Sequence, residues 1–232
     1  MKWGGVSLPY RKDNLVPRKV ASLLDIPVDI IDDYILERGN LEVNGIDTVI
    51  VNWDCQKKRQ DGWAKSRTEA LFKQKFGIER VVWAPTSLPD EFTGGHIDGM
   101  ARFINANTVV VPKYVDQGHA GAEVYEDAAA AILKAGLNVL RMDMPGYFYF
   151  DPKVPGESGV EMEANYVNWL VGNGVVIATG FGVQEWDSAA RSAIEGYFPD
   201  RDVHMITTPT IWYYGGGVHC VTNDQPRSRI QP

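Results

Sequence analysis

The sequence predicts an α/β fold in which one small unit is repeated around an axis. Turn sequences recur near Asn44, Ala106 and Asn173, at intervals of about 62 and 67 residues. A strand-like apolar run lies on either side of each turn, and a helical pattern and one more short strand follow. Such a unit cannot bury its apolar sheet face alone and needs neighbours. Because hairpins alternate with single helices, we favour a propeller-like ring over the plain alternative, an open α/β sheet.

The first unit opens with an alternating apolar stretch that leads into the first turn. A strand is expected at 48–51, where four β-branched residues follow one another. The next helix is expected to begin at Ser66, where Glu69 would complete a capping box, and to end at Gly77. A closing strand at 81–83 completes the unit.

The second and third units repeat this order. For the second unit we expect strands at 101–104 and 108–111, a helix at 122–135 and a strand at 139–142. For the third we expect strands at 166–171 and 175–178, a helix that Asp187 caps and that runs to about 198, and a strand at 203–206. Between these units, the Pro- and Gly-containing segment 145–159 is expected to form a long surface loop.

The two ends of the sequence read as partial units. A helix at 13–24 and a strand at 28–31 form the second half of a unit whose opening hairpin is absent. The chain stops soon after Cys220, which is expected to open a final strand. We therefore expect three complete and two partial units in a single domain, 1–232, that is incomplete at its N-terminus. An open ring exposes sheet edges, which favours association into a homo-oligomer.

Composition narrows the classes of partner. The 232 residues carry a formal net charge of −7, which argues against nucleic acid and anionic membranes and suits a cationic substrate. No apolar run approaches the roughly 20 residues that cross a bilayer, and the first residues have no signal-peptide core. Two cysteines form neither a disulfide framework nor a metal-ligand pattern, so we expect a cytoplasmic protein that needs no metal or cofactor.

Reactive side chains recur at matching places in the units. Glu37, Asp98 and Asn168 each precede a turn by five to eight positions, and His96 lies just before Asp98. Cys220 follows a run of three glycines. Each residue is expected near the start of the first strand of its unit. Because equivalent strand starts converge on the axis of a ring, we expect these side chains to meet in one central cleft.

This set of side chains suits the hydrolysis of a guanidinium group. Cys220 is a nucleophile as its thiolate, and His96 can move protons. Two ionised carboxylates, Glu37 and Asp98, can hold a planar cation by paired charge-assisted hydrogen bonds. Attack on the central carbon would give a covalent thiouronium intermediate, which water would hydrolyse to a ureido product.

Each residue also has a plainer interpretation. A lone cysteine such as Cys220 is more often buried and inert than reactive. Glu37 sits beside Arg38 and could form a surface ion pair with it. His219 is adjacent to Cys220, so in a strand it would point to the opposite face and make a poor catalytic partner. Cys55 is interpreted as structural or incidental.

Five motifs together resemble agmatine deiminases and the related bacterial peptidylarginine deiminases. The similarity follows the family's order over nearly the whole chain. The motifs are Trp3-Gly4-Gly5, Leu36-Glu37-Arg38-Gly39-Asn40, Thr93-Gly94-Gly95-His96-Ile97-Asp98, Asn165-Tyr166-Val167-Asn168-Trp169 and the segment 216–226, which contains Cys220.

The resemblance implies the five-bladed α/β propeller of the guanidine-modifying (pentein) superfamily. It implies Cys220 as nucleophile, His96 as general acid/base, and Glu37 and Asp98 as guanidinium-binding carboxylates, with Asn168 lining the substrate cleft. The implied reaction converts agmatine to N-carbamoylputrescine and ammonia, in putrescine and polyamine synthesis. Peptidylarginine or free arginine is the alternative substrate.

The chain also departs from the family pattern. Arg38 stands where the family usually has glycine after the first carboxylate. Family members are longer, so the N-terminal blade and part of the next are expected to be missing here, together with a further substrate-binding aspartate. An inactive homologue that acts as a binding module is therefore a second hypothesis. A papain-like hydrolase is disfavoured because His96 precedes Cys220 in the chain.

Overall fold

Three small sheets of one topology make up most of the structure. The computed structural model describes residues 11–60, 62–88, 91–116 and 118–225. Within them, each three-stranded sheet pairs its central strand antiparallel with the first strand and parallel with the third. These strands are β1 (Glu42–Val43), β2 (Thr48–Asn52) and β3 (Arg80–Ala84); β4 (Arg102–Asn105), β5 (Thr108–Tyr114) and β6 (Asn138–Met144); and β9 (Leu170–Gly172), β10 (Val175–Gly180) and β11 (Asp202–Thr207). The repeated unit predicted from the sequence is confirmed.

One helix joins the second and third strands of each unit, as predicted. These helices are α3 (Lys65–Phe76), α4 (Ala122–Lys134) and α5 (Gln184–Tyr197). The first unit carries an additional helix that was not predicted, α2 (Trp53–Arg59). The Asn52 side chain caps it by accepting the backbone N–H of Cys55 at 3.1 Å. No helix in the described ranges has the length and apolar character needed to cross a bilayer.

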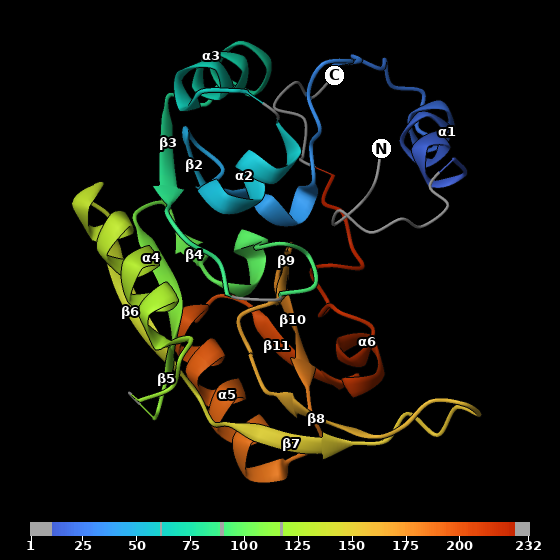
Figure 1. Ribbon diagram of the computed structural model, residues 1–232, viewed down its shortest axis with the longest axis vertical. Coiled ribbons are helices and arrows are strands. Elements are labelled where there is room, and N and C mark those ends of the chain that lie inside the picture. The colour runs from blue at the N-terminus through green and yellow to red at the C-terminus, as the bar shows by residue number, and fades with distance from the viewer. Residues whose placement is uncertain (1–10, 61, 89–90, 117, 226–232) are drawn as a thin grey trace.

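Neighbouring units bury each other's apolar faces. Helix α4 lies against β3 of the preceding unit (Figure 1). Val82 of β3 and Ile132 of α4 share one core cluster. Met142 of β6 and Ile194 of α5 share a second cluster in the same way. Helix α4 therefore covers the third strand of the unit before it, and the described residues do not form a closed sheet.

The N-terminal region agrees with the prediction only in part. The expected helix is present as a 3₁₀ turn (Asp13–Leu15) followed by α1 (Val16–Leu23). The strand expected at 28–31 is wrong, because this segment does not pair with a neighbour and is not a strand. Its apolar side chains at Val28 and Ile30 are exposed. In the described part of the chain, no strand lies beside this segment to complete a backbone ladder.

The long loop expected at 145–159 is also wrong in part. It contains β7 (Tyr147–Phe150), which pairs antiparallel with β8 (Val160–Glu163). Four consecutive aromatic residues have a strong preference for strands, and this preference overrides the turn signals of the flanking Pro and Gly. This two-stranded arm extends away from the three sheets (Figure 1).

Two predicted helix caps are wrong, and one strand is shorter than predicted. Helix α3 has Ala64 as its N-cap, and Glu69 instead accepts the indole N–H of Trp83 at 2.8 Å. Asp187 lies in the first turn of α5, where its carboxylate accepts the backbone N–H groups of Phe181 and Gly182 at 2.9 Å. The first strand of the third unit, expected at 166–171, is only β9, which begins at Leu170 and ends at Gly172.

Candidate active site

Three of the predicted site residues occupy matching places just before the first strand of their units. Glu37 precedes a 3₁₀ turn (Arg38–Asn40) that leads to β1. Asp98 lies in a second 3₁₀ turn (Ile97–Gly99) that leads to β4. Asn168 lies two residues before β9. The repeat thus delivers polar side chains from three units to one end of the sheets.

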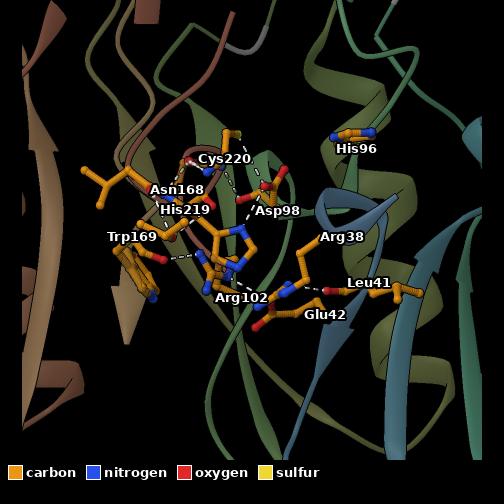
Figure 2. Close-up of polar contacts among 12 residues, drawn as sticks. Arg38, Leu41, Glu42, His96, Asp98, Arg102, Asn168, Trp169, His219 and Cys220 are labelled. Atoms are coloured by element: carbon orange, nitrogen blue, oxygen red, sulfur yellow. Dashed lines mark hydrogen bonds and ion pairs between the residues drawn. The ribbon is translucent and has the colours of Figure 1, made fainter. Parts of the chain in front are cut away.

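The thiol of Cys220 lies against the carboxylate of Asp98 (Figure 2). Cys220 Sγ is 3.4 Å from Asp98 Oδ2, and the Cys220 backbone N–H donates to Asn168 Oδ1 at 3.4 Å. Asn168 Nδ2 donates to the backbone carbonyl of Asp98 at 3.2 Å. The structure therefore brings Cys220, Asp98 and Asn168 together. Cys220 lies in a turn, so the expectation that it opens a strand is wrong.

His219 contacts the same carboxylate, contrary to the prediction that it points away. Its Nδ1 is 2.8 Å from Asp98 Oδ2, and both side chains are 2% exposed. The strict alternation of a strand does not apply in a turn, so consecutive residues His219 and Cys220 both reach Asp98 (Figure 2). Asp98 is thus shared between an imidazole and a thiol.

A buried arginine holds the backbone on which Asn168 lies. Arg102 Nη1 donates to the backbone carbonyl oxygens of Val167 and Trp169, on either side of Asn168. The Arg102 charge is balanced by Glu42, whose Oε2 lies 2.9 Å from Nε. Both side chains are buried, and the pair crosses from the first unit to the second. This contact fixes the position of the third unit's polar loop relative to the other two units.

Glu37 and His96 form a second pair. His96 Nε2 is 2.8 Å from Glu37 Oε2, and Arg59 Nε donates to Glu37 Oε1 at 2.8 Å. Arg59 also donates to the carbonyl oxygen of Thr93 at 2.7 Å. The alternative of a surface ion pair between Glu37 and Arg38 is wrong, since Glu37 is buried and Arg38 contacts Asp224 instead. Sequence reasoning missed Arg59 because it lies on the unpredicted helix α2.

One cavity of about 230 Å³ joins these groups. Its lining includes His96, Asp98, Asn168 and Cys220. Glu37 is not part of the lining, so it reaches the cavity through His96. Cys220 lines the cavity, and part of the residue is exposed to solvent. The arrangement offers a nucleophile, a proton carrier and a carboxylate to one ligand.

The charges of the site are set by burial and by these contacts. Burial of the thiol and the neighbouring Asp98 charge raise the pKa of Cys220 to about 12. Burial is the largest single influence on Asp98 and would raise its pKa, but the hydrogen bond from His219 and the nearby basic groups, among them Arg102, together outweigh burial and lower that pKa. Burial lowers the pKa of His219, more than the Asp98 contact raises it. At neutral pH, Asp98 is therefore ionised and Cys220 is a thiol.

Gly216 leaves room for the nucleophile, and we expect its replacement by alanine to impair activity. A Cβ at Gly216 would lie 2.7 Å from Cys220 Cβ and 3.1 Å from Sγ. Real Cβ atoms do not approach neighbours so closely, so the thiol must move. We expect Gly216→Ala to lower kcat for any reaction that uses the Cys220 thiol at least about tenfold. The matched control is Gly196→Ala in α5, where a Cβ meets nothing within 4 Å. Equal activity of the two variants would contradict this prediction.

Glu37 is expected to make stability depend on pH in the acid range. Burial favours its protonated form, but the hydrogen bonds from His96 and Arg59 outweigh burial and lower its pKa from 4.5 to about 2. A carboxyl group whose pKa is lower in the folded than in the unfolded chain stabilises the fold at pH values above its unfolded-state pKa. This stabilisation is lost as pH falls from about 4.5 to about 2. We expect Glu37→Gln to lower the free energy of unfolding by about 3 kcal/mol at pH 7 and by about half as much at pH 3. Urea unfolding at both pH values measures the difference, and an equal loss at both would refute the prediction.

Comparison with known proteins places the chain in a family. The family model for Porphyromonas-type peptidyl-arginine deiminase matches residues 1–226. Agmatine deiminases of Pseudomonas aeruginosa (strain LESB58) and Medicago truncatula are 27% and 29% identical to this chain over 97% of its length. The chain spans 66% of the length of each of these relatives.

A solved structure of agmatine deiminase from Enterococcus faecalis superposes with a TM-score of 0.86 at 27% identity, over 97% of this chain and 67% of that one. The α/β fold predicted from the repeat is thus shared with this structure. The motif Trp3-Gly4-Gly5 lies outside the described residues, whereas the motifs around Glu37, His96 and Asn168 lie within them. The chain belongs to the Porphyromonas-type peptidyl-arginine deiminase family.

Proposed function

We propose that this chain hydrolyses the guanidinium group of agmatine to N-carbamoylputrescine and ammonia. The observation that carries the proposal is the 3.4 Å contact between Cys220 Sγ and the buried carboxylate of Asp98, in a cavity that His96 also lines. A carboxylate beside a thiol raises the thiol pKa, so ionisation of the thiol is costly unless a cation enters the cavity. The names of the agmatine deiminases to which the chain is similar support the same substrate.

In the proposed mechanism the substrate cation activates the thiol. The guanidinium group binds Asp98 by charge-assisted hydrogen bonds and compensates its charge, which lowers the pKa of Cys220. The thiol loses its proton to His96, and the thiolate attacks the guanidinium carbon to give a tetrahedral adduct. His96 then protonates the leaving nitrogen, and the C–N bond breaks to release ammonia and leave a thiouronium on Cys220.

Hydrolysis of the thiouronium completes the cycle. His96 takes a proton from water, whose oxygen attacks the same carbon, and the C–S bond breaks. The adduct's hydroxyl proton passes to solvent, where the released ammonia takes it up, the neutral ureido product leaves, and Cys220 recovers a proton from His96. Glu37 acts in this proposal through its hydrogen bond to His96, which orients that imidazole, and not as the guanidinium-binding carboxylate expected from the sequence, because it does not line the cavity. Asn168 lines the substrate cleft and fixes the backbone of Cys220.

We also propose how the three units are arranged. The three units correspond in this proposal to three blades of a five-bladed α/β propeller of the pentein type. Helix α1 and the segment 26–33 would belong to a neighbouring blade. Asp29 and Asp33 of this segment contact Lys75 and Arg67 of α3 at 2.7 and 2.9 Å. Exposed edges of the open ring favour a homo-oligomer.

The proposed setting is a cytoplasmic enzyme of polyamine synthesis with a small cationic guanidino substrate and no nucleic-acid or membrane partner. Peptidylarginine or free arginine is the alternative substrate, and an inactive homologue that only binds is the second alternative. The limited volume of the cavity favours agmatine over a peptide.

An ammonia-release assay with agmatine, arginine and an arginine-containing peptide tests the proposal. We expect the highest kcat/KM with agmatine, and a ureido product in equal amount to ammonia. A higher value with arginine or the peptide would support the alternative substrate. Binding of agmatine without release of ammonia would support the inactive homologue.

A further inference from the structure

A second group of potential metal ligands lies behind His96. Glu37, Cys55 and His96 each offer one ligand atom, and these atoms all lie within 4.8 Å of one another. All three residues are buried, and Cys55 is 1% exposed. They come from three different segments, since Cys55 lies on α2 and the other two precede β1 and β4. The proposed hydrolysis uses Glu37 and His96 but gives no role to Cys55.

One pair in this group approaches the spacing of ligands in a zinc site, and the Cys55 sulfur lies within 4.8 Å of both of its members. Tetrahedral Zn²⁺ with sulfur, nitrogen and oxygen ligands at about 2.0–2.3 Å separates those ligands by about 3.2–3.6 Å. His96 Nε2 and Glu37 Oε2 are 2.8 Å apart and share a hydrogen bond. An ion that replaced this hydrogen would require the two atoms to separate by only a few tenths of an ångström. A cavity of about 10 Å³ borders Glu37 and Cys55.

The charges of the ligands match those of a divalent cation. A thiolate from Cys55 and the Glu37 carboxylate neutralise Zn²⁺, with His96 as a neutral ligand, and the positive charge of the buried Arg59 beside Glu37 remains. Two features oppose binding. Arg59 lies 2.8 Å from the other oxygen of Glu37 and repels a cation. Burial raises the pKa of Cys55 to about 12, so its proton must be displaced by the metal. Metal affinity should therefore fall as pH falls.

We propose that Glu37, Cys55 and His96 form a binding site for a thiophilic divalent cation such as Zn²⁺. Binding exchanges the Cys55 thiol proton for a Zn–S bond and releases that proton to solvent, without any change in oxidation state. The consequence for activity rests on the proposed function. Bound metal occupies the imidazole and carboxylate that hydrolysis requires, so micromolar Zn²⁺ inhibits and a chelator restores activity.

Titration with Co²⁺ as a probe for Zn²⁺ tests the site directly on the full chain under reducing conditions. A thiolate bound to Co²⁺ gives a charge-transfer absorption in the near ultraviolet, which does not depend on catalysis. The variant Cys220→Ser, which keeps Cys55, is expected to retain this absorption. Cys55→Ser, which keeps Cys220, is expected to lose it. Loss of the absorption in Cys220→Ser, or its retention in Cys55→Ser, overturns the proposal.

A second measurement covers the case in which Cys55→Ser fails to fold. X-ray absorption of the Zn²⁺ complex of Cys220→Ser is expected to show one sulfur at about 2.3 Å together with nitrogen and oxygen ligands. Nitrogen and oxygen ligands alone overturn the site. Neither experiment measures ammonia release, so a failure of the metal site is distinguishable from a failure of the proposed hydrolysis.

Discussion

Replacing Cys220 with serine is expected to lower kcat for ammonia release from agmatine by at least about a thousandfold. A serine hydroxyl at neutral pH is a far weaker nucleophile than a thiolate, and it cannot form the thiouronium. The residue is exposed and lies in a turn, so the free energy of unfolding should change by less than about 1 kcal/mol. Activity loss without loss of stability separates a chemical role of Cys220 from a structural one.

The adjacent Val221 provides a matched control for this prediction. Its side chain is exposed and does not line the cavity. We expect Val221→Ala to keep kcat within about threefold of the unmodified protein. A Cys220→Ser variant that retains more than a tenth of the original kcat would contradict the assignment of Cys220 as nucleophile.

Replacing Asp98 with asparagine is expected to abolish activity and yet to make Cys220 easier to ionise. The Asp98 charge, 3.4 Å from Sγ, is one reason why the pKa of Cys220 rises to about 12. Asparagine removes that charge, so the thiolate forms at lower pH. It also removes the anion that holds the substrate guanidinium, so we expect kcat/KM to fall at least about a thousandfold.

Alkylation of Cys220 by iodoacetamide as a function of pH measures this second effect. The midpoint of the alkylation rate should lie at lower pH in Asp98→Asn than in the unmodified protein. Asp200→Asn is the matched control, because Asp200 is an exposed carboxylate on another part of the surface. An unchanged or higher midpoint in Asp98→Asn would show that Asp98 does not control the ionisation of Cys220.

The repeated unit could be predicted from the sequence because its signals are local. Apolar runs on both sides of short turns specify hairpins, and a helix such as α3 ends at a glycine with a left-handed backbone at Gly77. Matching positions of Glu37, Asp98 and Asn168 then follow from the repeat. Whether these side chains meet at one site depends on how the units pack against one another. That packing could be predicted only because the units were expected to repeat in a regular arrangement.

The partners that complete the site could not be predicted in this way. His219 reaches Asp98 because its segment is a turn, and the sequence favoured a strand there. Arg59 and Cys55 lie on the short helix α2. Its N-cap, Asn52, is also the last residue of β2, so no turn sequence between strand and helix indicates where the helix begins. The strand expected at 28–31 does not form, for a different reason. Its residues suit a strand, but a strand also requires a neighbour, and the described residues offer none.

Mass spectrometry of the protein quenched in acid during turnover of agmatine tests the central claim most directly. The covalent mechanism predicts a peptide containing Cys220 whose mass is increased by that of agmatine less one ammonia. The same peptide from Asp98→Asn should lack the adduct. Rapid release of ammonia without any adduct on Cys220, or an adduct on Cys55 instead, would contradict the claim that Cys220 is the nucleophile of a guanidinium hydrolase.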